Sequence, residues 1–377
     1  MPLPRLSRRP RPGRPTLAAL LVLGLAGCAP GASPPGEAPQ IDDAETPRSI
    51  ILLMADGAGL AHWTLASFAD EALAVRSMRS VGLVDTRGAE HTVSGSAPTA
   101  TAYAIGVRSR MGHVGVDAEG RPMESVLEAA RARGRSTGLV TTTGIVDATP
   151  AAFGAHNTAR YNYGPIAREM ATKGITVLLG GGRAAFRPEA QADSADLLAQ
   201  VRREHIYVES IAELRALDPD TVDTLVGLLA EGEMGIVSER GDDALRTMTS
   251  TALDILSRNP AGFFLLIENE ESDTQSHRNA AEEIVTAEML DFDAAVRLAL
   301  AYRAEHPETL VLVTSDHETG GLSLPHDPDR EIVIEYSTGS HTGALVPLFA
   351  AGPGAERFGG IIRNDEVGRI LLEMARR

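Results

Sequence analysis

The sequence has almost no cysteine, and this absence limits the chemistry available to it. Among 377 residues there is one cysteine, Cys28. A single thiol cannot form an internal disulfide, and it cannot build a zinc site from several thiolates. Any metal ion that this chain binds must therefore be held by nitrogen and oxygen ligands.

The chain also lacks an apolar run of the roughly 20 residues that a membrane span needs. Its apolar stretch near the start, residues 17–25, follows a group of arginines and ends in the letters LAGC at Cys28. This pattern resembles a bacterial lipoprotein signal over residues 1–27, with Cys28 as the lipidated residue. An ordinary secretory signal with an incidental cysteine is the alternative. Residues 28–47 are rich in Pro, Gly, Ala and acid, which is typical of a flexible tether.

Positive charge is scarce. The chain has 35 Lys and Arg against 51 Asp and Glu, a formal net charge of −16. Such a surface argues against nucleic acid or anionic lipid as a partner, so an anionic substrate would have to be held by local charge from metals and a chosen arginine. No repeat at a fixed period is present, and residues 48–377 fit one domain.

Apolar runs alternate with helical stretches along this domain. We expect strands at 49–54, 136–142, 175–179, 262–267 and 309–314. We expect helices at 123–134, 163–173, 242–258 and 281–306. This order predicts an α/β fold with a mostly parallel sheet and helices on both faces. Residues 184–241 are more polar and acidic, and we expect them to form an excursion beside the sheet.

Carboxylates and imidazoles follow the later strands. Six potential metal ligands lie in the last third of the chain: Glu268, Asp273, His277, Asp316, His317 and His341. Ligands collect at the carboxyl ends of parallel strands, where mixed carboxylate and imidazole suit zinc and oxygen alone suits magnesium. Asp273 and His277 are four residues apart and share a helix face, although the stretch ENEESD is equally consistent with a solvated surface. These windows predict a metalloenzyme.

Two earlier motifs have both a functional and a structural interpretation. Asp56 follows the first strand in ADGAG, where it either binds a metal or caps the next helix. Ser96 stands before a predicted helix in SGSAPT. A serine there is usually an N-cap, but beside a metal its hydroxyl ionises and becomes a nucleophile.

A third motif, VDATP, places Asp147 and Thr149 on one face if the segment is extended. Arg160 follows and could offer a bidentate fork to a tetrahedral oxyanion. Taken singly, a turn and a surface arginine are the stronger interpretations. They do not explain why the motifs fall at the ends of predicted strands.

Together the motifs resemble the alkaline phosphatase family, in order and spacing, over residues 50–345. The resemblance implies a three-layer α/β sandwich and a phosphomonoester hydrolase with two Zn²⁺ and one Mg²⁺. It assigns one zinc to Asp273, His277 and His341. It assigns the other zinc to Asp56, Asp316 and His317, with Ser96 beside it.

The same resemblance implies the remaining roles. Ser96 looks like the nucleophile that becomes a phosphoserine, and Arg160 like the residue that clamps the phosphate. Asp56 looks like the carboxylate that bridges a zinc and the magnesium. Thr149 and Glu268 match direct magnesium ligands, with Asp147 one shell further out.

Three features depart from the family pattern. Gly95 stands where the best-known bacterial members have an aspartate that orients the arginine, which predicts a looser Arg160. Thr274 stands where a lysine or histidine often reaches the phosphate through water. The segment between His317 and His341 is short, so the large crown insert of animal members is small or absent.

We therefore expect a phosphomonoesterase of broad specificity. By resemblance it is exported, anchored through Cys28 and periplasm-facing, with Ala29 favouring the outer membrane, and family members are commonly homodimers. The alternatives are a phosphodiesterase, sulfatase or phosphonate hydrolase of the same superfamily, and a non-catalytic metal- or phosphate-binding lipoprotein. Sulfatases need an arginine that the SAPTA sequence lacks, and diesterases usually have a threonine nucleophile and no magnesium set.

Overall fold

The computed structural model of the protein describes residues 46–329 and 332–377. The predicted leader, Cys28 and nearly all of the tether lie outside these residues. Within the described part, no helix is both long and apolar enough to cross a membrane. The described residues form one compact unit around a ten-stranded sheet.

Five parallel strands at the centre of this sheet place the site. In sheet order they are β8 (Thr309–Thr314), β1 (Ser49–Ala55), β7 (Phe263–Asn269), β3 (Ser136–Gly144) and β4 (Val177–Gly181). Each overlaps one of the predicted strands. β1, β7 and β8 are mainly apolar and buried on both sides, and β3 is almost entirely buried although it contains four threonines. Met54 of β1 pairs with Glu268 on one side and with Thr314 on the other. The carboxyl ends of three strands therefore lie side by side.

Five further strands extend the sheet at its two edges. On one side follow β13 (Val346–Ala351), β2 (Ser80–Asp85) and β14 (Gly360–Arg363), and β13 runs antiparallel to both of its neighbours. On the other side follow β6 (Leu225–Leu228) and β5 (Ile206–Val208). The expectation that residues 184–241 lie beside the sheet is wrong, since this segment supplies β5 and β6 to the sheet itself.

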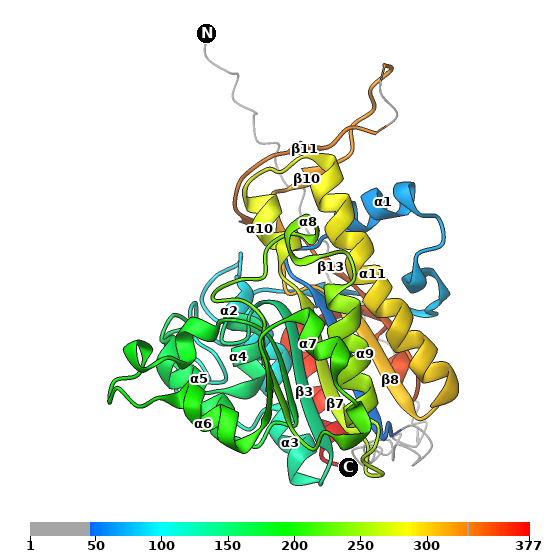
Figure 1. Cartoon of the computed structure of the whole chain (residues 1–377). Coiled ribbons are helices and arrows are strands. Elements are labelled where there is room, and N and C mark those ends of the chain that lie inside the picture. Colours follow the sequence, from blue (N-terminus) through cyan, green and yellow to red (C-terminus); the bar gives the residue numbers. More distant parts are fainter. Residues whose placement is uncertain (1–45, 330–331) are drawn as a thin grey trace, which may run out of the picture. The chain divides into compact units, whose positions relative to one another are not determined.

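Helices cover both faces of the sheet, which confirms the predicted α/β sandwich (Figure 1). Alternate residues of β1 point to opposite sides, so Ile50 and Leu52 pack into one core and Ile51 and Leu53 into the other. The first core includes α2 (Ser96–Ile105), α3 (Val126–Ala132), α4 (Ala148–Gly154), α5 (Tyr163–Thr172) and α12 (Asn364–Ala375). The second includes α1 (Leu60–Ala69), α9 (Ala244–Leu256) and α11 (Glu282–Glu305).

The remaining elements are short. The helices are α6 (Leu197–Glu204), α7 (Ile211–Ala216), α8 (Val237–Arg240) and α10 (Glu271–His277). Two small antiparallel pairs lie between β8 and β13, namely β9 (Glu318–Thr319) with β12 (His341–Thr342) and β10 (Leu322–Ser323) with β11 (Glu335–Tyr336). The expected small size of this insert agrees with these pairs.

Candidate active site

The carboxyl ends of β1, β7 and β8 bring together carboxylates from distant parts of the sequence. Asp56 directly follows β1, Glu268 lies near the end of β7, and Asp316 follows β8. The amide of Gly57 donates a hydrogen bond to Asp316 Oδ1 at 3.1 Å, which ties two of these strand ends together. All three carboxylates are buried. Parallel pairing thus builds an acidic site at one edge of the sheet.

Asp56, Asp316 and His317 form the first cluster. Their potential ligand atoms lie within 4.8 Å of one another. His317 Nε2 is 3.1 Å from Asp316 Oδ2 and 3.5 Å from Asp56 Oδ1. Both Asp56 Oδ1 and Asp316 Oδ2 are buried without a hydrogen-bond partner among the described residues. Buried carboxylate oxygens without donors fit a cation that accepts their lone pairs.

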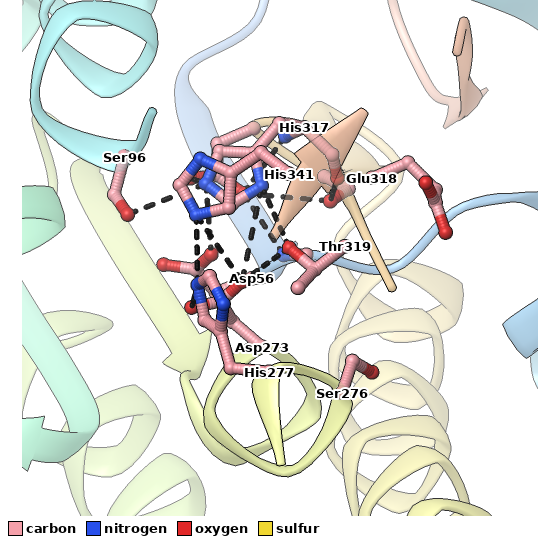
Figure 2. A network of polar contacts seen from close by, with 12 residues as sticks. Asp56, Ser96, Asp273, Ser276, His277, His317, Glu318, Thr319 and His341 are labelled. Carbon is pink, nitrogen blue, oxygen red and sulfur yellow. Dashed lines mark hydrogen bonds and ion pairs between the residues drawn. The ribbon is translucent and has the colours of Figure 1, made fainter. Parts of the chain in front are cut away.

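The second cluster joins Asp273, His277 and His341, which come from α10 and β12 (Figure 2). His277 Nε2 lies 3.0 Å from His341 Nε2 and 3.3 Å from Asp273 Oδ2, and His341 Nε2 lies 3.7 Å from Asp273 Oδ1. The ring of His317 stacks on that of His341 at 3.7 Å between centroids. The structure therefore brings these residues together as predicted, and it also places His317 next to both clusters.

Hydrogen bonds to Nδ1 fix the orientation of all three imidazoles. His277 Nδ1 donates to Gly339 O at 2.9 Å, and His341 Nδ1 donates to Ser94 O at 2.8 Å. Thr319 Oγ1 donates to Asp273, so at 3.2 Å it accepts from His317 Nδ1. In the neutral form of each ring the lone pair therefore lies on Nε2, directed into the site. This is the arrangement that metal-binding histidines require.

Asp147, Thr149 and Glu268 supply oxygen atoms only. Thr141 Oγ1 donates to Glu268 Oε2 at 2.6 Å, and Thr149 Oγ1 is buried without a hydrogen-bond partner in the described part of the chain. Asp147 caps α4 and accepts a hydrogen bond from Arg160 at 2.8 Å, so its carboxylate is already engaged. A set of hard oxygen ligands fits magnesium, with Glu268 and Thr149 better placed than Asp147 to bind it directly.

Burial and mutual repulsion perturb the titration of these groups. Burial raises the pKa of Asp56 well above its usual value, and the neighbouring Asp316 and Asp273 add to the rise. Burial raises the pKa of Glu268 to about 8, although its hydrogen bond from Thr141 opposes the shift. The hydrogen bond to Asp273 raises the pKa of His277 to about 9. Packing of this kind indicates a functional site in which a cation offsets the carboxylate charge.

Ser96 is the first residue of α2, and the N-cap of this helix is Gly95. The structural interpretation of Ser96 as an N-cap is therefore wrong. Its hydroxyl lies instead 3.4 Å from His317 Nε2, and the residue is only 5% exposed. Figure 2 shows Ser96 beside the rings of His317 and His341. A hydroxyl at a helix start beside a metal-binding cluster is well placed to become a nucleophile.

Arg160 lines the same pocket as Ser96. Its guanidinium is paired with Asp147 and packs over the Tyr161 ring, with Cζ 5.2 Å from the ring centroid. The absence of a carboxylate at Gly95 is thus matched by an ion pair to Asp147. This contact runs against the expectation that Arg160 is loosely held.

The pocket has a volume of about 570 Å³, and it includes residues that the sequence did not single out. Glu270 lines it, with one carboxylate oxygen accepting from Thr274 Oγ1 at 2.6 Å. Thr274 is occupied by this bond and does not line the pocket. Thr141 and Thr319 also support the site. Thr141 lies in β3 and Thr319 comes shortly after β8, and this position close to predicted ligands is their only signal in the sequence.

Comparison with known proteins identifies relatives along most of the chain. A family model described as alkaline phosphatase matches residues 47–332. Alkaline phosphatase H of Pseudomonas aeruginosa is 31% identical, over 85% of this chain and 83% of its own length. Streptomycin-6-phosphate phosphatase of Streptomyces griseus is also 31% identical, over 85% of this chain and 88% of its own length.

Solved structures agree with these sequence matches. Alkaline phosphatase from the Antarctic bacterium TAB5 superposes with a TM-score of 0.81 at 31% identity, covering 88% of this chain and 99% of that one. The Thermus thermophilus enzyme superposes with a TM-score of 0.78, covering 92% and 96%. At 23% identity this second likeness shows the fold alone. Sequence and structure thus point to the same relatives.

Proposed function

Because the chain belongs to the alkaline phosphatase family, we propose that Ser96 is its nucleophile and that two zinc ions and one magnesium ion complete its active site. Family membership makes the protein a metal-dependent hydrolase of phosphate monoesters. The observation that carries the finer proposal is the position of Ser96. Its buried hydroxyl lies 3.4 Å from His317 Nε2, and His317 belongs to both groups of side chains that could hold a metal ion, Asp56 with Asp316 and Asp273 with His341.

Three sets of side chains would hold the ions. One zinc would bind Asp56, Asp316 and His317, and the other would bind Asp273, His277 and His341. Magnesium would bind Thr149 and Glu268, with Asp147 in the next shell. Bound ions of this kind lower the pKa of a coordinated hydroxyl or water and neutralise charge on the oxygens that enter and leave phosphorus. A solved TAB5 variant with magnesium bound supports the expectation that this family site accepts that ion.

The protein's own residues then account for the reaction in two displacements. Arg160 binds the phosphate oxygens that do not react and fixes the phosphorus next to Ser96. Ser96 loses its hydroxyl proton and Oγ forms a bond to phosphorus. The bond from phosphorus to the ester oxygen breaks, and that oxygen takes up a proton and leaves as the free alcohol. Water then attacks the phosphoserine, the Oγ–P bond breaks, and inorganic phosphate leaves. Ser96 is regenerated with its proton.

A comparison of three substrate classes tests this function. We expect the metal-loaded protein to hydrolyse an aryl phosphate monoester much faster than the matching diester or sulfate ester, with three bound metal ions per chain by elemental analysis. A faster diester or sulfate ester reaction would favour the related branches of the superfamily. Full metal binding without any turnover would favour a non-catalytic binding protein.

We also propose that the protein is exported and anchored to the cell envelope through Cys28, facing the periplasm, and that it forms a homodimer. The leader pattern of residues 1–27 supports the anchor, and the common occurrence of dimers in the family supports the homodimer. Cys28→Ser should release the protein from the membrane fraction without changing its specific activity. Release of the wild-type protein from the membrane fraction by salt alone would contradict a lipid anchor.

A further inference from the structure

The rim of the active-site pocket carries an aromatic side chain that the proposed chemistry does not use. Tyr161 is 73% exposed, and it lines the pocket together with Ser96 and Arg160. A cavity of about 570 Å³ falls in the range that holds whole organic ligands, which is more than a phosphate group requires. The rim is therefore available to the organic part of the substrate.

The Tyr161 ring is held in place although it is exposed. One contact is the Arg160 guanidinium, 5.2 Å from the ring centroid, and another is Tyr163, which meets it edge to face at 6.1 Å and 89°. The backbone is fixed as well, because the Arg160 amide donates to Gly112 O at 2.7 Å. A ring that is already oriented loses little conformational freedom when a ligand packs against it.

A second apolar side chain, Met111, lies on the neighbouring loop. It is 50% exposed and also lines the pocket. A Cβ added to Gly95 would come within 3.1 Å of Met111 Cε, so the methyl group lies over the residue before Ser96. The hydrogen bond between Arg160 and Gly112 joins the Met111 loop to the Tyr161 loop. The glycine that departs from the family pattern therefore leaves room for an apolar group beside the nucleophile.

We propose that Tyr161 and Met111 form a subsite for an aromatic leaving group, so that aryl phosphates are favoured over small alkyl phosphates. The inference rests on the proposed function, in which Arg160 and Ser96 hold the phosphate. With the phosphate there, the ester group leaves the pocket past the rim. Aromatic rings pack favourably against tyrosine in offset or edge-to-face geometry, and methionine sulfur adds a further attraction to ring edges.

Two non-hydrolysable inhibitors test the subsite in the metal-loaded, full-length protein. Phenylphosphonate and methylphosphonate share the same anionic head and differ only in the group that would reach the rim. We expect phenylphosphonate to compete with substrate about tenfold more tightly in the wild type. In Tyr161→Ala this ratio should fall to about twofold, whereas Tyr161→Phe should keep it. Tyr207→Ala is the control, because Tyr207 also packs on an arginine, Arg202, but does not line the pocket.

The ratio of the two inhibition constants separates this role from a simpler one. If Tyr161 only supports Arg160, Tyr161→Ala will weaken both phosphonates equally and leave the ratio unchanged, which would overturn the subsite. An unchanged ratio with unchanged affinities would overturn it too. If the wild type neither hydrolyses monoesters nor binds either phosphonate, the proposed function itself is wrong.

Discussion

At the scale of the residue, the proton on Nδ1 of each histidine determines how its ring is oriented in the site. His277, His317 and His341 each present Nε2 to the centre, because each Nδ1 donates to a carbonyl or hydroxyl oxygen nearby. Two of these nitrogens, on His277 and His341, lie 3.0 Å apart, and in the neutral rings neither carries a proton to donate. Their lone pairs repel unless a cation or a proton is shared. The side chains outside the ligand set therefore decide how the ligand set is oriented.

His341→Ala should remove one zinc ion per chain, because it deletes one of the three proposed ligands of the zinc site formed by Asp273, His277 and His341. Elemental analysis after dialysis against limiting zinc measures the loss. His306→Ala is a matched control, since His306 directly follows the end of α11, stacks on Tyr302 and is 39% exposed. Unchanged zinc content in His341→Ala would show that this cluster is not a zinc site.

Buried ion pairs join neighbouring elements. Arg240 of α8 is fully buried between Glu288 and Asp291 of α11, at 2.7 Å from each. Glu288 also accepts from Asn269, the last residue of β7. This network connects the strand that carries Glu268 to the helix behind it. Desolvation makes such a pair costly to break.

Arg240→Met should destabilise the protein by about 3 to 5 kcal/mol, because it leaves two buried carboxylates without their cation. Chemical denaturation measures the change. Arg297→Met offers a control on α11, since Arg297 pairs with Asp293 but its side chain is 55% exposed, and its loss should change the stability by less than about 1 kcal/mol. Equal effects of the two substitutions would contradict the importance of burial.

A second network joins α3 and α5 to the segment after α4. His156 Nδ1 contacts Glu169 at 2.7 Å, and Lys173 bridges Glu128 and Glu169. Burial lowers the pKa of His156, but hydrogen bonds to Glu128 and Glu169 outweigh burial and raise it to about 9. The charged histidine therefore stabilises the fold fully below its usual pKa of 6.5, and this stabilisation is lost as the pH rises through about 9.

His156→Gln tests this pH window. At about pH 6 the variant should be less stable than the wild type by about 1 to 2 kcal/mol, after allowance for partial solvent screening. The difference should shrink steadily as the pH approaches about 10. Denaturation midpoints of both proteins across this range provide the measurement. A difference that stays constant with pH would mean that His156 acts through packing and not through charge.

At the scale of the whole molecule, burial decides which strands the sequence predicts. The five central strands are buried, and the sequence locates them to within about two residues, including β3, which is rich in threonine. The outer strands escaped prediction. β5 has three residues, β6 contains Gly227, and β13 contains Pro347, which is unusual inside a sheet. Their pairing depends on long-range contacts that no local pattern specifies.

The sequence predicts some features of the active site and not others. Parallel strands end at one edge, so the sequence predicts that Asp56, Glu268 and Asp316 lie at the same edge of the sheet. That β8, β1 and β7 are neighbours is known only from the structure. Three features are seen only in the structure: the stacking of His317 against His341, the pairing of Arg160 with Asp147, and the position of Tyr161 at the rim of the pocket. Each depends on how loops fold back over the sheet. The sequence does not specify those paths locally.

The most direct test of the account is the mass of the peptide that contains Ser96, taken from the metal-loaded protein quenched in acid during turnover of an aryl phosphate. In the wild type we predict a phosphate on Ser96. In Ser96→Ala we predict no phosphorylated peptide and no turnover, with a normal metal content. Phosphate on a different residue, or full turnover by Ser96→Ala, would contradict the account.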